Sequence, residues 1–433
     1  MGRFGLVWCG QVVTLIGNSV LRFSLVIQAW TVDHQATQVV ALSLCALLPQ
    51  MLLSPTAGAL VDRCRKRTAL QLADLGGLVA VGAMAAVYFL GDLHLWQVYV
   101  TVALLGACAA FQFPALSSAV PMLVGKEQLQ RANGLLATAK SVADVGGPAL
   151  AGLLVVTGGL GAVLVIDLIS FAVALATIRM VRLDGDRPGE GGTRKRLGAD
   201  SLEGLRYLFA QPSLRGLILV FFTVNLVMVF GFAVVQPMIL ARTGSDVSVL
   251  ASVNAGIGAG GIAGGLLLAA WGGPKNRVRG MMLGVVGMCL SAQIVMSVVH
   301  GVVAWTAAIL VGAMIMPIVN GSMQSIIQTK VPEERQGRVF GAVMFVSQIS
   351  SPVAMAFSGP LADHVFEPQA AAGTGVPGLL APLIGTGPGS GMAAMLLIAG
   401  LLGAAAALWG LAQRAVRHID VLTPDLEKQP AGG

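Results

Sequence analysis

The chain contains a dozen apolar stretches, each long enough to cross a lipid bilayer, separated by short polar segments. A membrane-spanning helix needs about 20 mostly apolar residues, and backbone in hydrocarbon must satisfy its own hydrogen bonds, which favours helices. Charged residues make up 11% of the chain, against roughly 25% in soluble domains, so little of it is left for a soluble domain. We therefore predict an all-α membrane protein with twelve transmembrane helices. The predicted spans are 4–30, 38–61, 68–91, 95–122, 132–157, 160–181, 213–241, 247–271, 279–300, 302–329, 338–366 and 391–413.

The basic residues predict the orientation of these spans. Apart from Arg22, Lys140 and Arg242, the 27 lysines and arginines fall at the N-terminus, in or beside the even-to-odd loops, or in the C-terminal tail. Lysine and arginine accumulate in cytoplasmic loops, so we expect both termini to be cytoplasmic in a bacterial inner membrane. The net charge of +7 then reflects membrane orientation, and a nucleic-acid partner is not needed to explain it.

The two halves of the chain match each other at an offset of 207 residues. Asn18 pairs with Asn225, and the loop 124–134 pairs with 331–341 at a valine, a glutamate, an arginine and a glycine. Parallel repeats of this kind are typical of transporters, whose binding site lies near the midplane between two bundles. We predict two pseudo-symmetric six-helix bundles with a cytoplasmic linker and a cytoplasmic tail. Their predicted limits are 1–181 and 213–413 for the bundles, 182–212 for the linker and 414–433 for the tail.

A basic loop between the second and third spans suggests a gating latch. It reads Gly58-Ala-Leu-Val-Asp62-Arg63-Cys-Arg-Lys66-Arg67. The glycine permits close helix packing, and the aspartate at the helix end is placed to bridge to a neighbouring helix. An ordinary positive-inside loop would explain the basic run as well, but not the Gly-x-x-x-Asp lead-in.

This loop resembles the signature loop of the major facilitator superfamily, Gly-x-x-x-Asp-Arg-x-Gly-Arg-Arg. The predicted fifth span carries Gly147, Pro148 and Gly152, which resemble the element that marks drug/proton antiporters of that superfamily. Generic packing of small residues is the alternative explanation for this element. The segments from Gly337 and Gly359 are similar to the branch that includes macrolide-efflux and enterobactin-exporter-like proteins. The resemblance implies proton-coupled efflux of small molecules.

Polar residues inside the predicted spans are candidates for a substrate cavity, because such groups are costly in hydrocarbon. Gln11, Asn18 and Arg22 share one face of the first span, although Arg22 is also placed to reach lipid headgroups. The remaining cavity candidates are Phe111, Gln112, Asn225, Gln236, Asn320 and Gln324.

Four ionisable residues are candidates for proton coupling. Lys140 and Asp144 stand at i and i+4, and Asp144 is predicted to lie nearest the middle of the bilayer. We expect Asp144 to be the coupling group, and a permanent structural ion pair with Lys140 is an equal alternative. Asp167 is the second choice, and Asp74 is expected to be mainly structural or to join the Asp62 latch.

The sequence contains no Gly-x-x-x-x-Gly-Lys-Ser/Thr loop for nucleotide phosphates, so energy must come from an ion gradient rather than from a cofactor. The leading hypothesis is a monomeric, proton-driven exporter of a hydrophobic or amphipathic small molecule. Uptake of a small solute is the alternative, and a membrane enzyme or a lipid-handling receptor is a distant one. The five histidines fall at or beyond span ends and form no catalytic motif.

Overall fold

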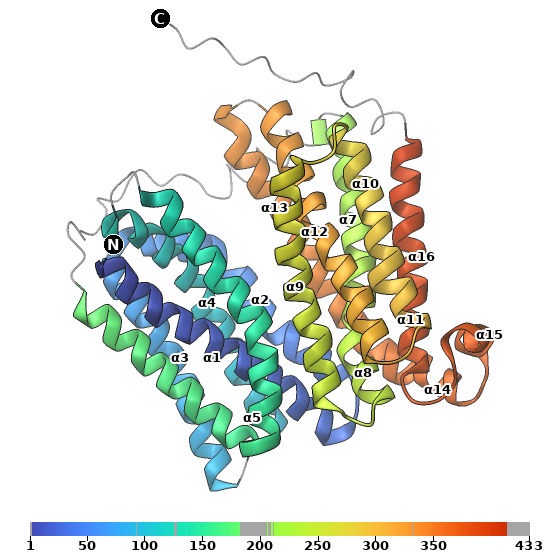
Figure 1. Cartoon of the computed structure of the whole chain (residues 1–433), viewed down its shortest axis with the longest axis horizontal. Coiled ribbons are helices and arrows are strands. Elements are labelled where there is room, and N and C mark those ends of the chain that lie inside the picture. The colour runs from blue at the N-terminus through green and yellow to red at the C-terminus, as the bar shows by residue number, and fades with distance from the viewer. Residues whose placement is uncertain are drawn as a thin grey trace, which may run out of the picture. The chain divides into compact units, whose positions relative to one another are not determined.

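A computed structural model describes residues 2–91, 93–124, 128–181, 206, 209–210, 212–331 and 333–413, and these fold as helices joined by short turns (Figure 1). Ten of the helical segments in this part of the chain are long and apolar enough to cross a membrane. One of them, Gly134–Met180, is 47 residues long, about twice what a bilayer requires. Counting it as two spans and adding the 29-residue helix Glu333–Leu361 confirms the twelve predicted transmembrane helices.

The first six spans lie in five helical segments. These are α1 (Gly2–Asp33), α2 (Ala36–Arg63), α3 (Lys66–Leu90), α4 (Leu95–Leu123) and α5 (Leu129–Met180). Helix α3 ends where Gly91 takes a left-handed conformation (φ 87°), which glycine adopts without strain.

Helix α5 contains two predicted spans because the chain reverses at Gly159, whose φ of 63° and ψ of −169° interrupt the helix. Contacts with α1 establish the reversal. In the first arm, Trp8 lies against residue 135 and Ser19 against residue 147, a parallel arrangement. In the second arm, Gly10 faces residue 177 and Gly17 faces residue 167, so this arm runs antiparallel to α1.

The remaining spans are more irregular. The helices are α7 (Pro212–Phe232), α8 (Val235–Arg242), α9 (Val247–Trp271), α10 (Arg277–Met288), α11 (Met296–Val298), α12 (Val302–Lys330), α13 (Glu333–Leu361), α14 (Glu367–Ala371), α15 (Gly375–Ile384) and α16 (Ser390–Ala412), with π-helical turns η2 (Cys289–Val295) and η3 (Ala362–Phe366). The predicted span 213–241 is divided by a turn at 233–234, and 279–300 contains η2. The stretch 367–390, between the last two predicted spans, holds α14 and α15.

The chain divides into two compact units. Unit 1 comprises Met1–Arg194 with Ile239–Gly258, and unit 2 comprises Lys195–Met238 with Ala259–Gly433. Most of the predicted linker 182–212 and the predicted tail 414–433 lie outside the described residues.

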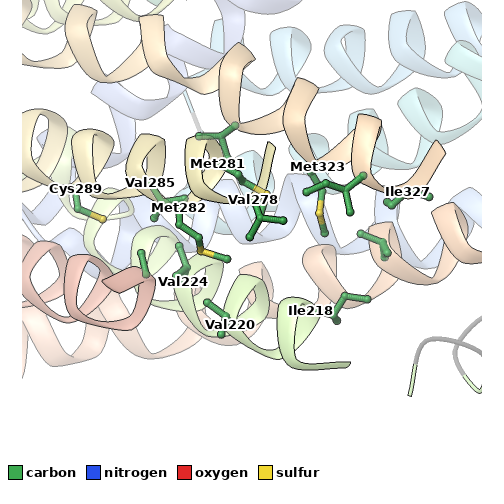
Figure 2. Packing of buried hydrophobic residues seen from close by; sticks show 14 of the residues in the cluster. Ile218, Val220, Val224, Val278, Met281, Met282, Val285, Cys289, Met323 and Ile327 are labelled. Carbon is green, nitrogen blue, oxygen red and sulfur yellow. The ribbon is translucent and has the colours of Figure 1, made fainter. Parts of the chain in front are cut away.

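Unit 2 is organised around an apolar core. Buried side chains from α7, α10, α12 and α16 pack into one cluster that includes Val224, Met281, Met282 and Met323 (Figure 2). The corresponding helices of unit 1 hold smaller apolar clusters, around Leu70 and around Phe4. Many other large apolar side chains, such as Val156 and Val303, stay exposed, as expected for helices that face lipid.

Candidate functional site

A buried polar cluster connects three helices of unit 1. The Gln112 side-chain amide of α4 donates to Asp74 Oδ1 of α3 at 2.8 Å, and the Gln11 amide of α1 donates to Asp74 Oδ2 at 3.3 Å. Gln112 Nε2 also lies 3.4 Å from Gln11 Oε1. The Asp74 side chain is 0% exposed and that of Gln11 2%. We call Gln11, Asp74 and Gln112 the amide-clamped carboxylate.

A second buried carboxylate, Asp167, lies where the second arm of α5 crosses α1. It is 0% exposed, and Oδ1 accepts a hydrogen bond from the Ser170 hydroxyl at 3.2 Å. Its other oxygen, Oδ2, has no hydrogen-bond partner within the part of the chain that the structure describes. A methyl group at Gly17 would lie 2.5 Å from both Asp167 Oδ1 and Ser170 Oγ, so glycine is required for this approach.

The predicted pair Lys140 and Asp144 is exposed on the first arm of α5, as is Arg22 on α1. Asp144 interacts electrostatically with both Lys140 and Arg22, and Arg22 also interacts with Asp167. Exposed charges at membrane depth are tolerated against water or partner charges but not against lipid. On this face of unit 1, Asp144 serves as the partner charge of both Arg22 and Lys140. Asp144, which we predicted to lie deepest in the bilayer, is the least buried of the three aspartates.

The antiporter-like element packs tightly within unit 1. A Cβ atom at Gly147 would lie 2.1 Å from Ser19 Oγ and 2.4 Å from Ser19 Cβ, and Pro148 is buried. A Cβ atom at Gly152 would lie 3.3 Å from the Ala251 methyl group. The first glycine thus permits close contact between α1 and α5, and the second permits a less tight approach to Ala251.

The basic residues of the predicted latch bind helix ends. Lys66 Nζ donates to the Val61 carbonyl oxygen at the end of α2 at 2.9 Å, and Arg67 donates to the Arg179 carbonyl oxygen at the end of α5 at 2.6 Å. Cations are favoured at such carbonyl-rich helix C-termini. The surroundings of Gly58 and the side chains of Asp62 and Arg63 lie outside what the structure describes.

The other cavity candidates are spread over both units. Asn18 and Phe111 are half-buried in unit 1. In unit 2, Asn225 donates to the Ser347 carbonyl oxygen at 2.8 Å, Gln236 is half-buried, and Asn320 and Gln324 are exposed on α12. These residues do not form one hydrogen-bonded cluster among the described contacts.

The sequence analysis missed Gln293, which is fully buried in the π-helical turn η2. Its amide donates to the Met228 carbonyl oxygen of α7 at 3.0 Å, and its Oε1 has no hydrogen-bond partner among the residues described. A lone glutamine in an apolar span was the available signal, because a polar side chain in hydrocarbon requires a partner.

Comparisons with known proteins agree with this architecture. The sequence profile of the Major Facilitator Superfamily matches residues 7–355. The chain is 26% identical over 369 residues to macrolide efflux protein A of Streptococcus pyogenes, covering 84% of this chain and 90% of that protein. It is 24% identical to the multidrug efflux pump Tap of Mycolicibacterium fortuitum over 334 residues, 74% of this chain and 80% of that protein.

Among solved structures, a bacterial homologue of the human lysosomal transporter Spinster superposes with a TM-score of 0.68 at 15% identity, covering 99% of both chains. This likeness shows the shared fold. Members of this superfamily are secondary transporters rather than enzymes, so a small molecule is the substrate and the bilayer the surroundings. The matched profile covers most of the chain, and the protein is therefore a multi-pass transporter that belongs to the major facilitator superfamily.

Proposed function

We propose that this transporter exports hydrophobic or amphipathic small molecules and that proton entry drives the export. The observation that carries the proposal is the set of ionisable groups on α1 and the first arm of α5: Arg22, Lys140 and Asp144. A carboxylate that water reaches and that two cations neighbour changes the charge of its surroundings when it binds a proton. Asp144 is the first candidate for the coupling group. Asp167, whose Oδ2 has no hydrogen-bond partner among the described residues, is the second.

Export as the direction of transport is supported by the relatives and by the antiporter-like element. The two similar proteins named above are efflux proteins, of macrolides in one case and of several drugs in the other. Gly147 and Pro148 give α5 the close packing and the interrupted backbone hydrogen bond that suit a bendable helix. Uptake of a small solute by the same fold is the competing function.

The proposal includes the arrangement in the cell. The bundles 1–181 and 213–413 flank a cytoplasmic linker, both termini lie in the cytoplasm, and the protein acts as a monomer in the bacterial cytoplasmic membrane. The distribution of lysine and arginine supports this orientation. The proposed function does not involve a nucleic-acid partner.

Accumulation of radiolabelled erythromycin in a drug-sensitive bacterial strain, with and without a protonophore, tests the proposal. Expression of the protein should lower accumulation, and the protonophore should restore it. Higher accumulation on expression would establish uptake, and no change for erythromycin or any member of an antibiotic panel would contradict drug efflux. Asp144→Asn should reduce proton-driven export at least tenfold while preserving exchange of labelled for unlabelled drug, whereas Asp33→Asn, at the exposed end of α1, should export normally.

A further inference from the structure

The amide-clamped carboxylate occupies positions that the second half of the chain fills with apolar side chains. The offset of 207 residues pairs Gln11 with Ile218, Asp74 with Met281, and Gln112 with Val319. All three partners are buried in the apolar cluster of unit 2, where Figure 2 shows Met281 on α10 and Ile218 on α7. Helix α4 (Leu95–Leu123) and helix α12 (Val302–Lys330) have the same length and are displaced by this offset at both ends.

This pairing does not depend on the register of a single residue. The buried residues of α10 are Val278, Met281, Met282 and Val285, so a neighbouring choice of partner for Asp74 is apolar too. In unit 2, the same helix arrangement therefore packs with apolar side chains at the positions where unit 1 buries a carboxylate. Packing alone does not require Asp74, and buried polar groups are often replaced by apolar ones without loss of stability.

No counter-ion for Asp74 is found among the residues that the structure describes. Its two described hydrogen bonds come from neutral amides, one on α1 and one on α4. Among the described residues, the titratable group that interacts electrostatically with Asp74 is the Cys108 thiol of α4, which carries no positive charge. On the α5 side, the Phe171 ring packs against Gly77, one turn further along α3.

We propose that Asp74 is a proton-binding site on which transport coupling depends. We further propose that the hydrogen bonds of Gln11 and Gln112 change when Asp74 binds a proton. This inference deepens the proposed proton-driven export and rests on it for the coupling. The ionised carboxylate accepts both amide hydrogen bonds. When a proton binds Oδ2, that oxygen becomes a donor and faces the Gln11 amide nitrogen, which is also a donor.

The conflict is relieved when the Gln11 amide rotates so that its oxygen accepts the new O–H group. Rotation turns the Gln11 nitrogen toward Gln112 Nε2 and removes the 3.4 Å hydrogen bond between α1 and α4. Proton binding at α3 thus removes the α1–α4 hydrogen bond and replaces the α1–α3 bond that Gln11 donates by one that Gln11 accepts. Helix α1 also carries Arg22 and Asn18. Protonation of Asp74 therefore changes the hydrogen bonds that connect this polar helix to α3 and α4.

The decisive variant is the triple substitution Gln11→Ile, Asp74→Met and Gln112→Val, which gives unit 1 the set that unit 2 already packs. Asp74→Asn is its single-site companion, because asparagine imitates the neutral acid. Both are reconstituted in proteoliposomes as full chains. Accumulation of radiolabelled erythromycin is measured with a pH gradient, and exchange of labelled for unlabelled drug without one.

We expect the triple variant to keep the melting temperature of the wild type, and gradient-driven accumulation to fall at least tenfold in both variants. Asp74→Asn, which retains both glutamines, should keep exchange. If the cluster were purely structural, gradient-driven accumulation and exchange would change together. Gradient-driven accumulation within twofold of the wild type in the triple variant would overturn the proposal. If Asp74→Asn does not fold, the triple variant still decides the question.

An infrared pH titration of the purified protein separates this inference from the proposed export. The wild type should show the carbonyl band of a protonated carboxyl group that is absent from the triple variant. If the wild type moves no drug but shows this band, the export proposal fails and the proton site stands. If drug export is proton-driven and the spectra of the two proteins are identical, the proton site is wrong and the export proposal stands.

Discussion

Adding one methyl group at Gly147 should weaken the contact between α1 and α5, whereas the same change at its neighbour Gly146 should not. A Cβ atom at residue 147 would lie 2.4 Å from Ser19 Cβ, while one at residue 146 would have no heavy atom within 4 Å. Carbon atoms pack at about 3.5–4.0 Å, so the helices must separate by about 1 Å around Gly147→Ala. Overpacking of this kind costs about 1–3 kcal/mol.

Both substitutions also replace glycine by the best helix former, which favours the helix by about 1 kcal/mol in each variant. The difference between the two variants therefore isolates the steric term. For a domain of 150–250 residues, 1 kcal/mol corresponds to roughly 2–4 °C in melting temperature. Gly147→Ala should thus melt roughly 2–12 °C below Gly146→Ala in detergent, and it should lose more drug export. Equal melting temperatures would refute the close approach of α1 and α5 that positions Ser19.

Three further predictions concern packing, capping and the missed glutamine. Gly264→Ala should melt below Gly265→Ala, because only the first places a methyl group 2.0 Å from a backbone oxygen, that of Met314. Asp246 accepts hydrogen bonds from two backbone N–H groups at the start of α9, and its pKa is lowered, chiefly by the Ser248 hydroxyl. The cap therefore stabilises the fold at neutral pH, and this contribution is lost as the pH falls below 3.8. Asp246→Ala should lower the free energy of unfolding at pH 7 by about 1 kcal/mol and remove that pH dependence. Asp246→Asn should keep the cap. Gln293→Met should remove the hydrogen bond that the side chain donates to the Met228 carbonyl oxygen, which destabilises the fold. It should also remove a buried oxygen that has no described partner, which stabilises it. We therefore expect a change in melting temperature within about 4 °C and no loss of proton coupling.

The sequence predicted the twelve helices because span length is set by the bilayer, and an apolar run reveals it directly. It also singled out Gln11, Asp74 and Gln112 as polar residues in apolar surroundings. It did not place them together, because they lie on three helices and no spacing along one helix encodes which faces meet. The structure brings these three residues into one hydrogen-bonded group.

Depth along one helix proved a poor guide to burial. The rise per residue placed Asp144 nearest the bilayer centre, yet burial depends on which neighbours cover a face. Asp167 is sealed because Gly10 and Gly17 let α1 approach its helix closely, whereas Asp144 points to an uncovered face of α5. The turn that divides the span 213–241 and the π-helical turn η2 also lacked a clear signal, since neither contains proline.

The two halves share constraints on their backbones but not on their polar content. Helix α4 approaches α2 through Gly106, whose Cβ would lie 2.1 Å from the Ala46 carbonyl oxygen. In unit 2 the equivalent pair, α12 and α9, makes the same kind of contact, but the glycine, Gly264, stands on the other helix. Sterics thus fix the distance between these helices whichever partner supplies the glycine. No comparable constraint fixes the chemistry of the buried positions, because hydrocarbon and a hydrogen-bonded carboxylate both fill them. A buried ionisable group that is present in one half and replaced by hydrocarbon in the other is therefore better explained by transport chemistry than by folding, and this asymmetry favours a search for the coupling site in unit 1.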